Sequence, residues 1–225
     1  QDQIFLNDQW SVLFGARFDH VTQDFQNKLA GTSNKKDLQQ TSPRLGLNYR
    51  LNDRWSWYAN YGESFALNSG MDRNGDVFNP EKGKSYEIGG KYQITPQSLL
   101  SLALFKMDKE NVLTTDPADS NYQITAGEVS SKGLELDLET QLNDQFSIRA
   151  NYSYTDAQVE KDQILAKGSR LSNVPKHSGS ISSNYEWTLA NADKVGLGAT
   201  AIYVGKRSGH STDNGFSFPE YTLLN

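Results

Sequence analysis

The chain has 225 residues, of which 22 are Lys or Arg and 27 are Asp or Glu, so its formal net charge is −5. Hydrophobic residues make up 36% of the chain and the mean hydropathy is −0.67, and no run of about 20 apolar residues exists that could form a membrane-spanning helix. The lack of cysteine excludes disulfides and cysteine-ligated zinc, and the acidic balance disfavours a nucleic-acid partner.

Alternation of apolar and polar residues with a period of two dominates the chain, which predicts an all-β fold. The strands that keep their apolar residues on one face are predicted at 10–18, 45–51, 55–61, 86–92, 132–141, 146–154 and 195–203. Residues 98–107 are apolar on both faces, so the sequence leaves open which of their side chains share the apolar face. At about ten residues, these strands are longer than the usual five or six.

Short and long connections alternate between the predicted strands. The short ones lie at 7–9, 52–54, 95–97 and 143–145, and the long ones at about 20–41, 66–84, 109–130, 157–175 and 207–219. A soluble sandwich or propeller does not explain long strands whose short turns all lie at one end. The pattern predicts about ten antiparallel, up-and-down strands of a transmembrane β-barrel.

The tryptophans support a membrane location. Each lies on the apolar face within about three residues of the short-turn end, as expected of an aromatic girdle against outer-membrane lipid. These residues are Trp10, Trp55, Trp57 and Trp187. Phe18, Phe65, Tyr154 and Tyr203 are candidates for a second girdle at the loop end.

The opposite face carries charges of both signs, which we interpret as lumen salt bridges or contacts to whatever fills the barrel. The predicted lumen-facing residues are Arg44, Arg50, Glu63, Glu87, Lys91, Glu135, Asp137, Glu139 and Arg149. Arg149 is expected opposite Glu139 or Asp137, depending on the register. The spacing of these acids does not indicate a catalytic acid/base pair. No metal site is indicated either, because segment 72–76 lacks the downstream Gly and Glu of a calcium loop.

Ligand contacts are expected in the long loops. Aromatic and cationic side chains there could form a vestibule that receives an anionic or aromatic chelate through stacking and charge. The candidates are Tyr122, Arg170, Phe78 and Phe216, with Phe218 beside them.

Several short strings resemble the signatures of TonB-dependent siderophore receptors, and they occur in the order expected of that family. They are SPRLGL at 42–47, YANYGESF at 58–65, NPEKG at 79–83 with YEIG at 86–89, GEV at 127–129 with KGLE at 132–135, NVPKH at 173–177 and PEY at 219–221. Each string alone is weak evidence, but together and in order they are specific.

The resemblance implies a barrel of about 22 strands whose lumen is filled by a plug domain. Residues 1–225 would be a later part of that barrel, with the plug outside this chain; the ends of the sequence also suggest a segment of a longer protein. The family resemblance further implies capture of a ferric siderophore and its import with energy from the TonB–ExbB–ExbD complex. It implies location in the outer membrane of a Gram-negative bacterium, with no enzymatic activity and no cofactor, the siderophore being cargo.

Two alternatives stay open at this point. One is a complete small outer-membrane barrel enzyme, such as a protease, with His177 and Asp156 near its loop end. The other is a TonB-dependent receptor for a different cargo, such as haem, cobalamin or a glycan. The strings at 79–83 and 173–177 favour siderophores over these cargoes.

Overall fold

The computed structural model describes residues 2–28, 31–190, 193–209 and 216–225. Its strands are β1 (Asp2–Phe5), β2 (Trp10–Asn27), β3 (Thr32–Arg50), β4 (Trp55–Ala66), β5 (Glu81–Thr95), β6 (Ser98–Thr115), β7 (Gln123–Gln141), β8 (Phe146–Lys161), β9 (His177–Thr188), β10 (Lys194–Val204), β11 (Arg207–Ser208), β12 (Ser217–Phe218) and β13 (Tyr221–Leu224).

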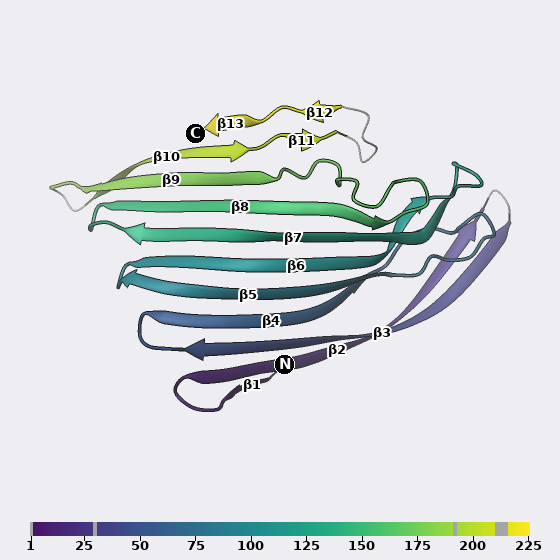
Figure 1. The fold of residues 1–225 in the computed structure, drawn as a ribbon, viewed down its shortest axis with the longest axis horizontal. Coiled ribbons are helices and arrows are strands. Elements are labelled where there is room, and N and C mark those ends of the chain that lie inside the picture. The colour runs from purple at the N-terminus through teal and green to yellow at the C-terminus, as the bar shows by residue number, and fades with distance from the viewer. Residues whose placement is uncertain (1, 29–30, 191–192, 210–215) are drawn as a thin grey trace.

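These strands form one 11-stranded sheet in the order β1-β2-β3-β4-β5-β6-β7-β8-β9-β10-β13, and β11 pairs separately with β12 (Figure 1). Every neighbouring pair is antiparallel, which confirms the predicted all-β, up-and-down arrangement as a partial barrel. Among the described residues, no helix is long and apolar enough to cross a membrane.

The short turns lie together at one end of the sheet, on the left in Figure 1. Three of them use the same device, in which an Asn side chain accepts hydrogen bonds from the backbone N–H groups two and three residues later. Asn7, Asn52 and Asn143 each accept both bonds at 2.9 Å. Because an Asn side chain can replace a backbone acceptor in this way, it favours a tight turn.

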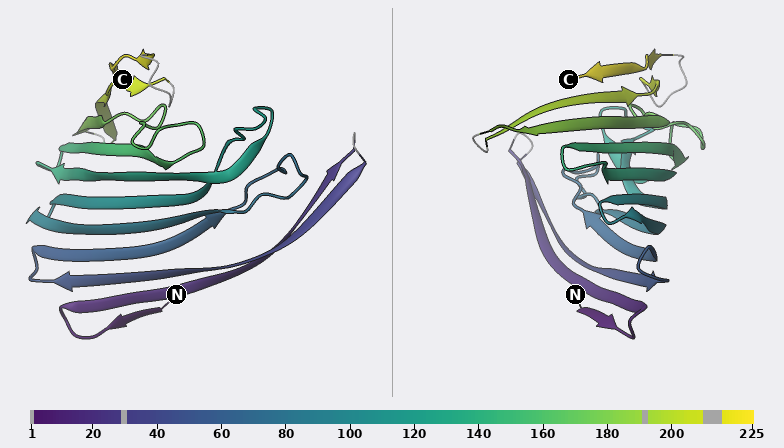
Figure 2. Two further views of the ribbon diagram at one scale, coloured as in Figure 1. Left: turned by 45° about the vertical axis from the view of Figure 1, so that its right-hand side comes forward. Right: turned by 90° about the vertical axis from the view of Figure 1, so that its left-hand side faces the viewer.

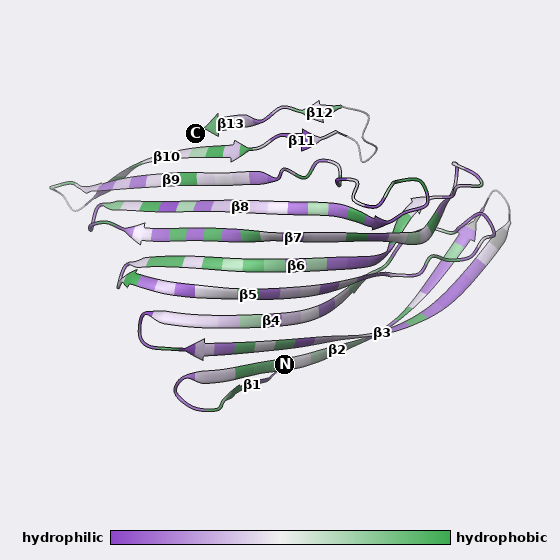
Figure 3. Cartoon of the chain, in the orientation of Figure 1, coloured by the Kyte–Doolittle hydropathy of each residue, from purple (hydrophilic) through white to green (hydrophobic). Residues whose placement is uncertain are grey.

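The register joins the predicted apolar faces into one continuous surface, called the apolar face below. One row across it runs Val12, Leu47, Ala59, Ile88, Leu104, Leu134 and Tyr154. This pairing resolves segment 98–107, because Leu100, Leu102 and Leu104 lie opposite Leu138, Leu136 and Leu134. In Figure 3 the hydrophobic bands gather in the half of the strands next to the short turns.

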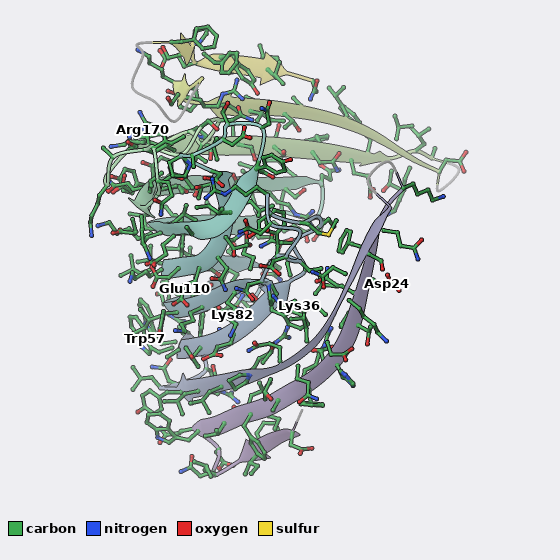
Figure 4. All side chains as sticks on the ribbon, turned by 90° about the vertical axis from the view of Figure 1, so that its right-hand side faces the viewer. Asp24, Lys36, Trp57, Lys82, Glu110 and Arg170 are labelled. Carbon is green, nitrogen blue, oxygen red and sulfur yellow. The ribbon has the colours of Figure 1, made fainter. Side chains whose placement is uncertain are left out.

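The sheet is curved, as the views in Figure 2 show. Trp57 lies on its convex side in Figure 4, so the apolar face is convex and the polar face is concave. The buried hydrophobic side chains among the described residues are Val77, Phe78, Ala157 and Val159, all beyond the apolar rows toward the loop end. The sheet therefore has no apolar core of its own, and it needs lipid on one face.

Two expectations require correction. Much of the predicted long connections 20–41 and 109–130 is strand, since β2, β3, β6 and β7 extend into them. Above the apolar rows both faces meet water, so the alternation fades although the backbone ladder continues. Glu63 was also predicted on the polar face, but it follows Tyr61 by two residues and shares the apolar face, where its carboxylate accepts a hydrogen bond from the Tyr61 hydroxyl.

Candidate functional site

The four tryptophans lie at the short-turn end of the apolar face. Trp10 stacks on Tyr49 with a ring-centroid distance of 4.4 Å, Trp55 stacks on Tyr92 at 4.3 Å, and Trp187 packs beside Tyr185 at 4.7 Å. The Trp57 ring lies over Gly90, where a Cβ atom would come within 2.8 Å of it. These rings form one rim of aromatic side chains, the arrangement expected of a membrane girdle.

On the polar face, two of the predicted charges form an ion pair between neighbouring strands. Arg149 on β8 lies opposite Glu139 on β7, and its Nη2 and Nε atoms lie 2.8 and 3.0 Å from the Glu139 Oε1 atom. The register therefore decides between Glu139 and Asp137 in favour of Glu139. Both side chains are largely exposed, so the pair contributes little to stability.

Three other carboxylates on this face, Glu87, Glu135 and Asp137, form what we call the carboxylate patch. Asp137 and Glu135 on β7 lie opposite Ser101 and Ala103 on β6, and these small residues separate them from β5. Among the described residues, none of the three carboxylates has an ion-pair partner.

Tyr58 borders the carboxylate patch. Its ring lies over Gly89, and its hydroxyl is hydrogen-bonded to the Glu87 carboxylate. The Lys91 ammonium lies 5.9 Å from the centre of the same ring, which is a cation–π distance. The patch thus keeps negative charge that a cationic partner in the lumen could neutralise.

The long loops at the end of the sheet opposite the short turns, called the apical loops below, contact one another. The Arg73 Nε atom of the β4–β5 loop lies 3.3 Å from Asp116 Oδ2 in the β6–β7 loop, and the Asp116 side chain is 6% exposed. Phe78 is 6% exposed and packs against Gly70, so it belongs to the interior of its loop. Tyr122, by contrast, is 41% exposed.

The hairpin of β2 and β3 is fastened to the β4–β5 loop. The Lys36 Nζ atom donates to the carbonyl of Val77 and to Asn79 Oδ1, both at 2.9 Å, and Asn34 Nδ2 donates to the Gly75 carbonyl at 2.6 Å. A cavity of about 550 Å³, called the Lys36 cavity below, lies between these segments. Lys35, Lys36, Asp72 and Asp76 are the charged residues that line it. Sequence reasoning missed Lys36, because its partners lie about 40 residues away and no local pattern marks it.

The β8–β9 loop folds back along β8. Its backbone forms a bridge between Arg170 and Gln158, supported by hydrogen bonds from Val159 N to Ser169 O at 2.8 Å and from Leu171 N to Ala157 O at 3.1 Å. Gln158 follows the alternation of the apolar face, and Arg170 accordingly lies on the convex side in Figure 4. The structure thus separates Arg170 from the Lys36 cavity. In the same loop, the hydrogen bond from Lys167 to Glu160 raises the pKa of Lys167.

Arg207 is a second residue that sequence reasoning missed. Its guanidinium lies 5.4 Å from the ring centres of both Phe218 and Tyr221, and Nη1 donates to Asn173 Oδ1 at 3.0 Å. It therefore joins the NVPKH string at 173–177 to the PEY string at 219–221, and the two strings lie 42 residues apart. Phe216 is exposed and lies 5.3 Å from Phe218.

The separation runs from His177, the last residue of the first string, to Pro219, the first residue of the second. No local pattern could have indicated a contact over that distance along the chain. The only signal was that both strings had matched the same family.

Comparison with known proteins agrees with this geometry. The family model described as "TonB dependent receptor-like, beta-barrel" matches residues 1–225. The chain belongs to the TonB-dependent receptor family. Proteins of this family are outer-membrane β-barrels of Gram-negative bacteria, and the named relatives are transport receptors rather than enzymes.

Among curated relatives, the metal-pseudopaline receptor CntO of Pseudomonas aeruginosa is 41% identical over 231 residues, covering 100% of this chain and 33% of that protein. The ferrichrome outer membrane transporter/phage receptor of Escherichia coli K12 is 31% identical over 230 residues, covering 100% of this chain and 30% of that protein. The chain therefore spans about a third of the length of these TonB-dependent receptors.

Solved structures share the fold. The ferric yersiniabactin uptake receptor FyuA of Yersinia pestis superimposes with a TM-score of 0.81 at 21% identity, covering 99% of this chain and 35% of that one. The siderophore receptor PiuA of Acinetobacter baumannii gives a TM-score of 0.80 at 22% identity, covering 97% and 34%. Both matches show that the curved sheet has the fold of about a third of these receptors.

Proposed function

We propose that this chain is part of the wall of a receptor that takes up a ferric siderophore through the outer membrane. The observation that carries the proposal is that the whole chain aligns, at 30% identity or more, with receptors named for metal-pseudopaline, ferrichrome and ferrioxamine B. A metal chelate is the class of cargo that these names share.

The apical loops support capture at the outer end. The Lys36 cavity opens between segments that hydrogen bonds hold together, and Lys36 brings a positive charge to its wall. Because Lys35 and Lys36 share the wall with Asp72 and Asp76, a chelate would be held there by individual contacts, such as one to Lys36, rather than by net charge. Exposed aromatic rings outside this cavity, such as Tyr122 and Phe216, could stack on the chelate. Phe78 would act by holding its loop in shape, and Arg170 would act from the outer rim.

The polar face supports a filled lumen. We expect a plug domain to present Lys or Arg side chains to the carboxylate patch and to contact Arg44. Glu139 and Arg149 also face the lumen, but each is already paired with the other and offers the plug less charge. Import would need those contacts to loosen, and we propose that the TonB–ExbB–ExbD complex supplies the energy through the plug. Since the siderophore itself holds the iron, the receptor would need no cofactor and would make no covalent bond.

The proposal is tested by titrating the protein, expressed from its complete gene and purified in detergent, with a panel of ferric siderophores of hydroxamate, catecholate and carboxylate type. Quenching of tryptophan fluorescence would report binding. Saturable binding of at least one chelate is expected, and a variant with Lys36→Gln should bind it more weakly. If every ferric chelate fails to bind, the siderophore assignment is wrong.

A second cargo is favoured by one observation. The relative at 41% identity is named for metal-pseudopaline, whereas the ferrichrome and ferrioxamine B receptors are 31% and 30% identical. A metal–pseudopaline complex therefore belongs in the same titration. Binding of that complex without binding of any ferric siderophore would replace the first cargo with the second.

A further inference from the structure

The sheet opens where the β2–β3 hairpin parts from β4. β3 pairs with β4 only between 44–50 and 56–62, whereas β2 and β3 stay paired up to Asn27 and Thr32. Above Arg44 the two strands diverge (Figure 2), and the Gln23 Nε2 atom reconnects the hairpin to the Asn68 carbonyl at 3.1 Å. A cavity of about 380 Å³, called the fork cavity below, lies where they part; it is lined by Gly15, Ala16, Arg17, Ser42, Arg44, Glu63, Ser64 and Phe65.

Arg44 lies in this cavity, and the residues directly beside it on its own face are small. Its register partners are Gly15 on β2 and Gly62 on β4, and the residues two positions away along β3 are Ser42 and Gly46. Among the described residues its guanidinium has neither a hydrogen bond nor an ion pair. The small neighbours therefore leave an open space beside an uncompensated positive charge.

Arg17, which lines the same cavity, shows the contrast. Its Nε atom donates to both carboxylate oxygens of Asp19 at 2.8 Å, so its charge is compensated. The positive charge that is left to attract a ligand into the fork cavity is that of Arg44.

Ser42 is an independent second observation. It is 7% exposed, and its Oγ atom is buried without a hydrogen-bond partner. A buried hydroxyl is costly to leave unsatisfied, so such groups in folded proteins are normally paired with protein, water or ligand. Ser64, which lines the cavity from β4, brings a second hydroxyl.

We propose that the fork cavity binds a small oxyanion, a carboxylate or phosphate group, held by the Arg44 guanidinium and the hydroxyls of Ser42 and Ser64. A guanidinium donates two parallel hydrogen bonds to two oxygens of a carboxylate or phosphate, and each hydroxyl can donate one more. Glu63, which also lines the cavity, would repel a second negative group, which favours one compact anion beside Arg44. This site does not depend on which chelate is the cargo.

The oxyanion could come from either of two sources. It could be a free anion from the medium, or a carboxylate side chain from a segment of the same polypeptide that fills the lumen. The chemistry is the same in both cases, so the test must separate the sources.

The test uses the protein expressed from its complete gene and purified in detergent, with the midpoint of thermal unfolding read from heat-modifiable gel mobility. Inorganic phosphate or acetate is titrated against chloride at constant ionic strength. For a free anion, the midpoint rises with phosphate or acetate, and Arg44→Gln or Ser42→Ala weakens the apparent affinity at least tenfold. Arg149→Gln, which removes the same charge from the polar face away from the fork, should keep the wild-type response.

For an internal carboxylate, the wild-type midpoint does not change with either anion. Arg44→Gln and Ser42→Ala each lower the midpoint, and Arg44→Lys restores part of the loss. The proposal is overturned if the wild-type midpoint does not respond to either anion and Ser42→Ala does not lower it, or if the response to anions is as strong in Arg44→Gln and Ser42→Ala as in the wild type. The first of these results is the one expected of a hydroxyl that bonds nothing, and the Arg44→Lys variant guards against misfolding as the explanation of a lowered midpoint.

Discussion

The two faces of the same strands follow different rules. On the apolar face one requirement acts everywhere, so side chains such as Ile88, Leu104 and Leu134 repeat in rows and any apolar residue satisfies it. On the polar face each position has its own neighbours, as the paired Glu139 and the unpaired Glu135 show. Lipid imposes a uniform condition on one side, whereas the contents of the lumen impose specific ones on the other.

The largest expected effect comes from placing a charge on the apolar face. Leu104→Arg should destabilise the folded protein by about 2–4 kcal/mol, because an arginine near the middle of the bilayer loses its hydration. The matched change Ser101→Arg, three residues away on the polar face and opposite Asp137, should cost less than about 0.5 kcal/mol. Urea titration in lipid vesicles measures both, and equal costs would contradict the assignment of the two faces.

Two adjacent glycines give a second test, because each lies beneath an aromatic ring on a different face. Gly89→Ala should cost about 1–3 kcal/mol, since the new methyl group overlaps the Tyr58 ring and disturbs its bond to Glu87. Gly90→Ala should cost less than about 1 kcal/mol, because the Trp57 ring can move into fluid lipid. The same unfolding titration decides, and a costlier Gly90→Ala would mean that Trp57 packs against protein.

The carboxylate patch allows a functional version of the comparison. Neutralising it with Glu135→Gln and Asp137→Asn should leave the fold intact but loosen whatever fills the lumen, by about 1.4 kcal/mol or a tenfold rise in channel openings. Conductance of the complete protein across a planar bilayer measures this. Glu139→Gln is the control, because Glu139 already has Arg149 as its partner; a similar rise in the control would show that the patch has no special role.

The smallest effect is expected for that exposed pair. A double-mutant cycle with Glu139→Gln and Arg149→Gln should give a coupling energy below about 0.5 kcal/mol, because water screens both side chains. Unfolding titrations of the two single variants and the double variant supply the cycle. A coupling above about 1 kcal/mol would indicate that the pair is desolvated in the complete barrel.

The parts of the fold that depend on residues adjacent in the sequence were predictable from the sequence alone. Asn52 and Asn143 form turns because their side chains accept hydrogen bonds from backbone N–H groups two and three residues later. The alternation around Leu136 shows which side chains of its strand share the apolar face. Glu63 was assigned wrongly because a charge was expected on the polar face, yet above the lipid a charge is tolerated on either side. The face on which Leu102 lies could be assigned only from its cross-strand partner Leu136, and the register of the structure supplies that pairing.

The candidate site was less predictable, because it depends on contacts between distant segments. Lys36 meets Asn79 and Arg207 meets Asn173 across 43 and 34 residues, and nothing in either local sequence indicates the partner. Phe78 and Tyr122 are both aromatic loop residues, but packing buries one and exposes the other. The loops therefore could be located, while their interactions could not.

The length of the β2–β3 hairpin has a mechanical consequence. Its strands of 18 and 19 residues reach about 60 Å, more than twice the height of an apolar band of about 25 Å. The outer part is a hydrogen-bonded ladder rather than a slack tether, and it is continuous with the strands that carry Trp10 and Tyr49 at the opposite rim. A force applied to the outer end of the hairpin is therefore transmitted through a rigid hydrogen-bonded ladder to the part of the wall that lies in the membrane.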